Sequence, residues 1–222
     1  MQQLFNPENQ FWQFVALCMR YFVLNLLFVI TIIPIVTIGP ARAALYSTVF
    51  AYHENEDIHL GREYLKRLKR EFLPSLASSL IIIAVIAVAM FSIVFWNALD
   101  TDLAYVTLPV LIIVGAIALL TFEYYSPLQA RYANAFGKTL RNAMMMPWAA
   151  FRHTLGLIAI DVAGLALFLF TGWFRVAFIL LGFAWLAYAK SFIFLRAFDA
   201  VSGDPTAERP APDYSMPTGS IQ

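Results

Sequence analysis

Five apolar stretches, each long enough to cross a lipid bilayer as a helix, constrain the fold of this chain more than any other feature. A hydrocarbon core of about 30 Å needs roughly 20 apolar residues in an α-helix. The backbone polar groups of a spanning segment must pair within that segment, so we predict that all five stretches are helices. The expected spans cover residues of about 21–38, 76–98, 104–125, 154–171 and 176–198.

The composition agrees with a chain that lies mostly in lipid. Hydrophobic residues make up 61% of the 222 residues, and charged residues only 13%. A soluble domain has about 45–50% apolar and about 25% charged residues. We therefore predict an all-α fold, a polytopic transmembrane helical bundle. Residues 1–198 are expected to form one membrane-embedded domain, and the Pro-, Gly- and Ser-rich residues 199–222 a disordered cytoplasmic tail.

The first stretch has an alternative interpretation as a secretion signal. Arg20, the apolar run and the small residues Ala41 and Ala43 imitate the basic region, apolar region and cleavage site of a signal peptide. However, 19 residues precede Arg20, including Glu8 and bulky aromatics, which is a poor start for such a signal. Four further spans follow, so an uncleaved first helix is the simpler prediction.

The distribution of Lys and Arg predicts the orientation. Residues 42–71 hold six of these cations and residues 131–153 hold four, whereas the link between the second and third spans has none. Positive charges accumulate on the cytoplasmic side of a membrane. Both basic segments are therefore expected in the cytoplasm. With five spans, the N-terminus is then expected outside and the C-terminus inside.

Amphipathic helices on the cytoplasmic side are predicted next to the spans, at about residues 41–52, 60–73 and 131–146. In the second of these, Leu60, Tyr64, Leu68 and Phe72 repeat every four residues, so they share a face that is expected to lie in the acyl boundary. The rest of that helix holds five cations that are candidates for contact with anionic lipid or for docking a cytoplasmic partner: Arg62, Lys66, Arg67, Lys69 and Arg70. The plainer interpretation is that these charges only fix the topology, and the sequence leaves both open.

A break rich in Pro and Gly, "PIVTIGPARAALY" at residues 34–46, interrupts the end of the first span. Pro34 is expected to kink the helix. Gly39 permits a left-handed backbone, and Pro40 suits the first position of a new helix. Arg42, one turn inside that helix, makes its N-terminus a candidate anion site, and the alternative is a purely structural elbow. Pro74 predicts a second bend, just before the second span.

Three ionisable residues within the spans, Asp161, Lys190 and Glu123, are candidate functional residues because charge inside a bilayer is costly. We predict that Asp161 pairs with Lys190, since a hairpin of the fourth and fifth spans leaves an offset of only about 6 Å between them. Arg131 is the alternative partner of Asp161. Glu123 is expected to neutralise either Arg131 or Arg42. Such pairs either hold helices together or line a polar cavity that accepts a substrate or a proton.

Several classes of function find no support in the sequence. Cys18 is the one cysteine, and the three His residues have no metal-ligand spacing, so we expect no metal site and no cofactor. No nucleophile–base pairing, phosphate loop or carboxylate dyad appears, so we expect no catalytic residues and no enzyme. The net charge of +1 indicates no nucleic-acid partner. Asn25 in the first span is expected to hydrogen-bond a neighbouring helix.

Two segments resemble the signatures of the YesL-like family of bacterial integral membrane proteins. In the break at residues 34–46, the residues that carry the resemblance or depart from it are Pro34, Thr37, Gly39, Pro40, Arg42 and Tyr46, with Arg42 standing where smaller polar residues are common. In "YSPLQARYANAFGKTLRNA" at residues 125–143, they are Pro127, Arg131 and Asn142, while Ser126 stands where Phe is common. "LFNP" at residues 4–7 also fits the family.

The resemblance implies a compact bundle of about five helices in the bacterial inner membrane, and it implies no known activity. Members of the family are often encoded beside carbohydrate importers and glycan-degrading enzymes. We therefore expect an accessory membrane protein of oligosaccharide uptake. The alternatives are a small transporter or permease subunit that acts as an oligomer, and a structural or lipid-organising protein. The expected partners are anionic lipids of the inner leaflet, a carbohydrate importer of the ABC class and further copies of this chain.

Overall fold

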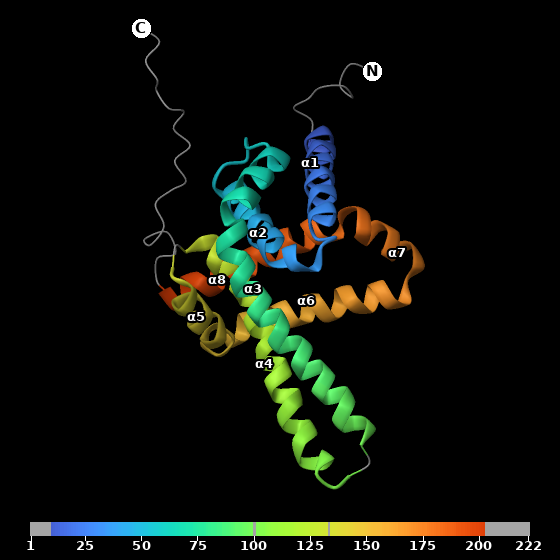
Figure 1. Cartoon of the computed structure of the whole chain (residues 1–222). Coiled ribbons are helices and arrows are strands. Elements are labelled where there is room, and N and C mark those ends of the chain that lie inside the picture. Colours follow the sequence, from blue (N-terminus) through green and yellow to red (C-terminus); the bar gives the residue numbers. More distant parts are fainter. Residues whose placement is uncertain (1–9, 100, 133, 203–222) are drawn as a thin grey trace, which may run out of the picture.

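The structure, a computed structural model, describes residues 10–99, 101–132 and 134–202, and every regular element within them is a helix (Figure 1). In chain order the elements are α1 (Gln10–Thr31), the 3₁₀ turn η2 (Ile35–Thr37), α2 (Ile38–Glu54), α3 (Leu60–Ala98), α4 (Ala104–Arg131), α5 (Phe136–Ala149), α6 (Phe151–Phe170), α7 (Gly172–Ala177), the π-helix η3 (Phe178–Gly182) and α8 (Phe183–Ser202). The segment at residues 4–7 and residues 203–222 of the expected tail lie outside the described residues.

Five helical segments are long and apolar enough to cross a membrane. They are Trp12–Thr31, Leu60–Ala98, Ala104–Arg131, Phe151–Phe170 and Gly172–Val201. The predicted helical class and the expected number of about five spans are thereby confirmed. The chain fits a multi-pass integral membrane protein.

The helices are arranged around α2, which contacts α1, α3, α4 and α8. Helices α3 and α4 pack against each other as a long antiparallel hairpin that extends away from this centre (Figure 1). Helices α6 and α8 also pack together and lie crosswise to the hairpin (Figure 1). The core is therefore concentrated at one end of the hairpin, where all these helices meet.

Helix α2 is enclosed by protein on nearly all sides, since 13 of its 17 residues are buried. Small residues allow this close packing. A Cβ atom on Gly39 would collide with the side chain of Ser79 and come within 3.2 Å of the carbonyl oxygen of Ser75, both on α3. The structure thus differs from the expectation of an interfacial helix at residues 41–52, because the Gly and Ala residues of this segment bring it into contact with other helices rather than with lipid.

The break between the first two helices comes earlier than expected. Helix α1 ends at Thr31, because a proline disfavours helical backbone in the residue before it, and Pro34 itself is extended. The Thr37 hydroxyl donates to the Pro34 carbonyl at 2.7 Å and closes the turn. Helix α2 then begins at Ile38, so Gly39 has helical rather than left-handed backbone. Gly39 is needed for its missing Cβ, not for an unusual backbone conformation.

Helix α3 runs without interruption through Pro74, where a bend was expected between an interfacial helix and the second span. A proline inside a helix removes one hydrogen bond. Contacts with α2 hold α3 on both sides of this position. Before it, Arg67 donates to the Ser47 hydroxyl at 2.6 Å, and after it Ser79 packs directly on Gly39.

Helices α1 and α3 run in the same sense, and α2 returns between them. Near the middle of α1, Arg20 Nη1 donates to the carbonyl oxygen of Glu56, at 3.1 Å, in the loop before α3. At the end of α1, the hydroxyls of Thr31 and Tyr64 share a hydrogen bond, one turn into α3. The first half of α1 therefore lies at the same end of the molecule as the loop of residues 55–59.

Candidate functional site

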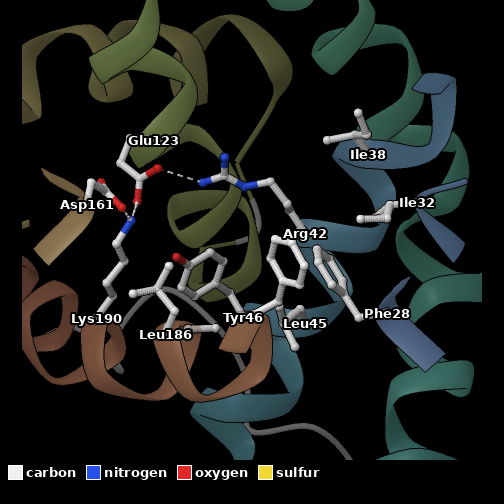
Figure 2. A pocket seen from close by; sticks show the side chains of 12 residues that line it. Phe28, Ile32, Ile38, Arg42, Leu45, Tyr46, Glu123, Asp161, Leu186 and Lys190 are labelled. Carbon is white, nitrogen blue, oxygen red and sulfur yellow. Dashed lines mark hydrogen bonds and ion pairs between the residues drawn. The ribbon is translucent and has the colours of Figure 1, made fainter. Parts of the chain in front are cut away.

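Four charged side chains from four helices meet in the interior of the bundle (Figure 2). Arg42 Nη2 on α2 lies 2.9 Å from Oε2 of Glu123 on α4. Lys190 Nζ on α8 lies 2.8 Å from Oε1 of the same carboxylate and also contacts Oδ1 of Asp161 on α6. These residues, Arg42, Glu123, Asp161 and Lys190, are termed the ionic cluster below.

The ionic cluster confirms one predicted pair and resolves one alternative. Asp161 pairs with Lys190, as the axial offset between their helices predicted. Glu123 pairs with Arg42, whereas Arg131 pairs with Glu54 at the end of α2. The expected anion site at the start of α2 is therefore filled from within the chain. The anion beside Arg42 is the carboxylate of Glu123.

Charge within the ionic cluster is balanced, because two cations face two carboxylates. Burying an unpaired charge costs several kcal/mol, so buried charges are found paired. The Lys190 side chain is only 5% exposed and is held by two carboxylates, while the Asp161 side chain remains 42% exposed. Asp161 is thus the member of the cluster that a ligand can reach with the least rearrangement.

The ionic cluster lies between two cavities. The smaller cavity, about 280 Å³, is lined by all four members of the cluster and by the aromatic rings of Phe28, Tyr46 and Phe183 (Figure 2). The larger cavity, about 580 Å³, lies between α4 and α6 and has mostly apolar walls. Arg42, Glu123 and Asp161 line both cavities. A ligand in either one would meet the same charged groups.

Aromatic residues support the polar groups of the site. The guanidinium carbon of Arg42 lies 4.5 Å from the ring centroid of Phe122, which is a favourable cation–π contact. Burial raises the pKa of the Tyr46 hydroxyl, so this group stays protonated and neutral. The smaller cavity therefore offers cationic donors, anionic acceptors, a neutral hydroxyl and aromatic faces side by side. This combination suits a small ligand with several hydroxyl groups.

The ionic cluster is poorly equipped to hold a metal ion. It contains two carboxylates, and both are already engaged by Lys190. In the part of the chain that the structure describes, no group of three His, Cys, Asp or Glu side chains is placed to hold a metal ion. That the protein needs no metal or cofactor, and that it is not an enzyme, stay predictions.

The two segments that carry the family resemblance meet where α2 packs against α4. Arg42–Glu123 ties the start of α2 to α4, and Glu54–Arg131 ties its end. Pro127 is buried inside α4 between these two ion pairs. Asn142 is half-buried on α5, a helix that lines neither cavity. The second signature, at residues 125–143, thus contributes Arg131 to the contact between α4 and α2. Asn142, near its end, lies away from the ionic cluster.

The cations expected on the surface of α3 do not all lie there. Arg62, Lys66, Lys69 and Arg70 are exposed, but Arg67 is only 4% exposed and pairs with Glu63. The apolar face expected in lipid is covered as well, since Leu60 and Tyr64 are fully buried in the protein core. Over its first five turns the buried positions of α3 are Leu60, Tyr64, Arg67, Glu71, Ser75 and Ser78, which are three or four residues apart. A helical face drawn with this spacing includes Arg67, and it would have predicted that Arg67 is buried. The face drawn with a constant spacing of four residues leaves Arg67 out.

Other residues of the site had no signal in the sequence. Phe122 supports Arg42, and Thr154 lines the larger cavity while its hydroxyl lies 2.8 Å from the hydroxyl of Tyr124. Aromatic residues and threonines are ordinary components of membrane helices. Their position next to charged groups depends on how α4 and α6 pack.

Asn25 links α1 to the helix that carries Lys190, which confirms its predicted hydrogen bond to a neighbouring helix. Its side-chain amide donates to the Ile179 carbonyl at 2.7 Å, and its side-chain oxygen accepts from the Ala184 N–H at 3.0 Å. Both partners lie in or beside the π-helix η3, where the regular α-helical ladder is interrupted. The buried Asn25 side chain satisfies backbone groups of this irregular segment, which lipid could not do.

Comparison with known proteins gives one match. Residues 21–93 match the model of a family described as "Protein of unknown function, DUF624", which covers about a third of the chain. The matched region includes the break at residues 34–46 and ends before the second signature at residues 125–143. No curated protein and no solved structure matches the chain. The match therefore adds a similarity over residues 21–93 to an uncharacterised family and assigns no activity.

Proposed function

We propose that this chain is an accessory membrane protein of a bacterial oligosaccharide uptake system and a member of the YesL-like family. The resemblance of two segments to the signatures of that family supports the proposal, as does the family match over the first of them. In the structure both segments contribute to the contact between α2 and α4, beside the ionic cluster. The segments that carry the resemblance thus also build the candidate site.

The observation that carries the proposal is a charge-balanced ionic cluster beside an aromatic cavity. Sugar hydroxyls donate to carboxylates and accept from guanidinium and ammonium groups, and such charge-assisted hydrogen bonds are strong. Aromatic rings such as Phe28 and Tyr46 can cover the apolar faces of a sugar ring. A neutral ligand also leaves the balance of charges intact. The cavity, at about 280 Å³, lies just below the roughly 300–1,000 Å³ of ligand sites, so it fits a single sugar unit rather than a long chain.

The proposed location is the bacterial inner membrane, with the basic segments and the C-terminus in the cytoplasm. Five complete spans would then put the N-terminus outside. The parallel course of α1 and α3 instead favours an N-terminus on the same side as the loop of residues 55–59, because Arg20 reaches the Glu56 carbonyl. Topology reporters fused before residue 2 and after residue 222 separate the two arrangements. Reporters on the same face support the second, and reporters on opposite faces support the first.

Uptake of labelled oligosaccharide by a deletion strain tests the proposed function. The strain is complemented with the wild type, with Leu186→Trp and with Val176→Trp. Leu186 lines the smaller cavity, whereas Val176 is exposed and lines neither. We expect Leu186→Trp to lose uptake although the protein is present in the membrane, and Val176→Trp to retain it. Equal uptake by the deletion strain and the wild type would refute a role in carbohydrate uptake.

The exposed cations of α3 are the proposed docking surface for an importer of the ABC class. Lys66 and Lys69 lie on the exposed side of α3, and the Lys66 side chain is 67% exposed. Charge reversal of both residues to Glu should remove an identified sugar permease or ATPase that co-purifies with the wild type, because an acidic partner surface would then be repelled. If only lipid co-purifies with the wild type, the structural or lipid-organising alternative is supported instead.

A second candidate function is that the chain carries the sugar itself, as an oligomer. The three charged residues that line both cavities favour this function, because ionisable residues inside a membrane protein mark substrate pathways. Proteoliposomes that contain only the purified protein distinguish the two functions. Sugar uptake by them supports a carrier. Uptake that requires the importer in the same vesicles supports the accessory role.

A further inference from the structure

We propose that the larger cavity, between α4 and α6, is a specific site for one phospholipid with a primary-amine zwitterionic headgroup, of the phosphatidylethanolamine class. This inference concerns a different cavity from the proposed sugar site and does not depend on the proposed function. It rests on the shape of the cavity, on the charges at its end and on the depth at which those charges lie.

The walls of the larger cavity are suited to an acyl chain. They are formed by apolar side chains of α4 and α6, among them Leu119, Leu120, Ile158 and Val162. Leu119 and Val162 are each more than half exposed, so the cavity opens toward the surroundings of the bundle. In a membrane those surroundings are lipid chains, and one chain can enter between the two helices without leaving an apolar medium.

The polar end of this cavity carries both signs of charge. Arg42, Glu123 and Asp161 line it together. A guanidinium has five N–H donors, more than its bond to Glu123 requires, so Arg42 can also bind a phosphate. The exposed carboxylate of Asp161 can accept hydrogen bonds from a primary ammonium. A zwitterionic headgroup therefore matches the site with no net charge left over.

Two other common headgroups match the polar end less well. A choline headgroup has the same charges, but its quaternary ammonium has no N–H to donate to Asp161. A glycerol headgroup leaves the lipid with a net negative charge, which would lie beside the carboxylates of Glu123 and Asp161. Charge and hydrogen-bond capacity thus select the amine over both.

The depth of the ionic cluster also fits a headgroup. Glu123 lies 19 residues beyond Ala104, the first residue of α4. At 1.5 Å per residue this distance is about 28 Å, close to the thickness of the hydrocarbon core of about 30 Å. When the start of α4 lies at one membrane surface, Glu123 lies near the opposite one. Asp161 lies at the same level as Glu123 although it is midway along α6, because both carboxylates contact the Lys190 ammonium.

Competition between lipids tests the proposal. The full-length protein in mild detergent is mixed with equal amounts of phosphatidylethanolamine, phosphatidylcholine and phosphatidylglycerol of identical chains, and the bound lipid is counted by native mass spectrometry. We expect phosphatidylethanolamine to be retained about fivefold to tenfold over the other two, which corresponds to one charge-assisted hydrogen bond at a partly exposed carboxylate. Equal retention of the three lipids would overturn the proposal without any variant.

Three variants locate the bound lipid. Val162→Trp fills the cavity and should abolish the preference, whereas Leu167→Trp, on the opposite face of α6 and similarly exposed, should keep it. Asp161→Asn removes the charge that recognises the ammonium, so it should reduce retention of phosphatidylethanolamine to the level of phosphatidylcholine. A preference that survives both Val162→Trp and Asp161→Asn places the lipid elsewhere and overturns the proposal. Leu186→Trp should leave the preference unchanged, so loss of sugar uptake and loss of lipid selectivity are separable.

Discussion

Helices α2 and α6 show opposite relations between hydrophobicity and burial. Helix α2 contains glycine, alanines, hydroxyl residues and an arginine, and 13 of its 17 residues are buried. Helix α6 is richer in Leu, Ile, Val and Phe, yet only Thr154 and Leu157 of its 20 residues are buried. In water the apolar helix would be the buried one. The difference fits a helix whose solvent is lipid, with small size and polar partners determining which helix lies inside.

This contrast identifies what holds the bundle together. Lipid chains are as apolar as leucine, so apolar side chains gain little by leaving lipid for protein. Close packing at small residues and hydrogen bonds between helices remain as the main attractive terms. Substitutions in the small and polar interior should therefore cost much more stability than substitutions on the apolar surface, and the following variants test that expectation from the largest effect to the smallest.

The largest effect is expected for Gly39→Leu at the contact of α2 with α3. The new side chain would collide with Ser79 and with the backbone of α3, and forcing helices apart costs about 3 kcal/mol or more. Gly164→Leu on α6 is the matched control, since a Cβ there meets nothing within 4 Å. We expect Gly39→Leu to abolish a monodisperse peak in size-exclusion chromatography and Gly164→Leu to leave the peak and the thermal midpoint unchanged. Similar behaviour of the two variants would contradict the contrast between the helices.

Lys190→Met should be nearly as destabilising. It removes the cation that Glu123 and Asp161 share, and breaking the mostly buried pair with Glu123 costs about 3 kcal/mol, whereas the half-exposed Asp161 adds less. Adding Asp161→Leu removes the stranded carboxylate and should restore part of the stability, because Glu123 keeps Arg42. Lys66→Met, at an exposed ion pair, serves as the control and should change the unfolding free energy by less than about 0.5 kcal/mol. Denaturant unfolding of the wild type, Lys190→Met, Asp161→Leu and the double variant gives the coupling energy. A double variant no more stable than Lys190→Met would show that Lys190 acts independently of Asp161.

Asn25→Leu keeps the size of the side chain and removes its two hydrogen bonds to the π-helix segment. The Ile179 carbonyl and the Ala184 N–H then lose their partner, which costs about 1–2 kcal/mol. Amide hydrogen exchange at Ala184 should accelerate, while the amides of α4 keep their protection. Thr107→Val is the control, because that hydroxyl is bonded only within its own helix and should contribute little. Unchanged exchange at Ala184 in Asn25→Leu would exclude Asn25 as the partner that stabilises η3.

The smallest effect concerns pH and the end of α2. His53 Nε2 lies 2.7 Å from the Ser191 hydroxyl, which itself donates to the Tyr188 carbonyl, so the imidazole is the donor in this contact. Burial lowers the pKa of His53, although Glu54 and Glu56 partly oppose this shift. Below the ordinary pKa of about 6.5 the unfolded state binds more protons than the folded state, so stability falls as the pH is lowered through this range. His53→Phe should reduce the loss of thermal midpoint between pH 7.5 and about 5.5. An identical pH profile in the wild type and the variant would exclude His53 as a contributor.

The class of the fold and part of the site could be predicted from the sequence because they depend on local pattern. Long apolar runs require helices in lipid, and a helical hairpin fixes the offset between Asp161 and Lys190 within a few ångströms. For the same reason, the sequence limited the expected ion-pair partners of Glu123 to two residues. Its bridging position between Arg42 and Lys190 depends on how three helices pack, and that arrangement has no local signature.

The sequence was least informative where a local rule competes with a tertiary contact. Pro74 and Gly39 each have a well-known local meaning, a bend and a left-handed turn. In the structure α3 stays helical through Pro74, and Gly39 lies in helical backbone that packs against Ser79 of α3. Arg67 belongs to the same category, since a cation among cations was expected outside and instead bonds to Ser47 in the interior.

The length of α3 has a mechanical consequence. At 39 residues and 1.5 Å per residue, the length of α3 along its axis is about 58 Å. This is nearly twice the thickness of the hydrocarbon core. The contact of α2 with α3 extends as far as Ser79. The remaining 19 residues of α3, up to Ala98, extend about 28 Å beyond this contact. A rotation of this part of α3 by one degree about Ser79 would move Ala98 by about half an ångström. A rearrangement among the buried charges that tilted α3 would therefore displace the far end of the hairpin.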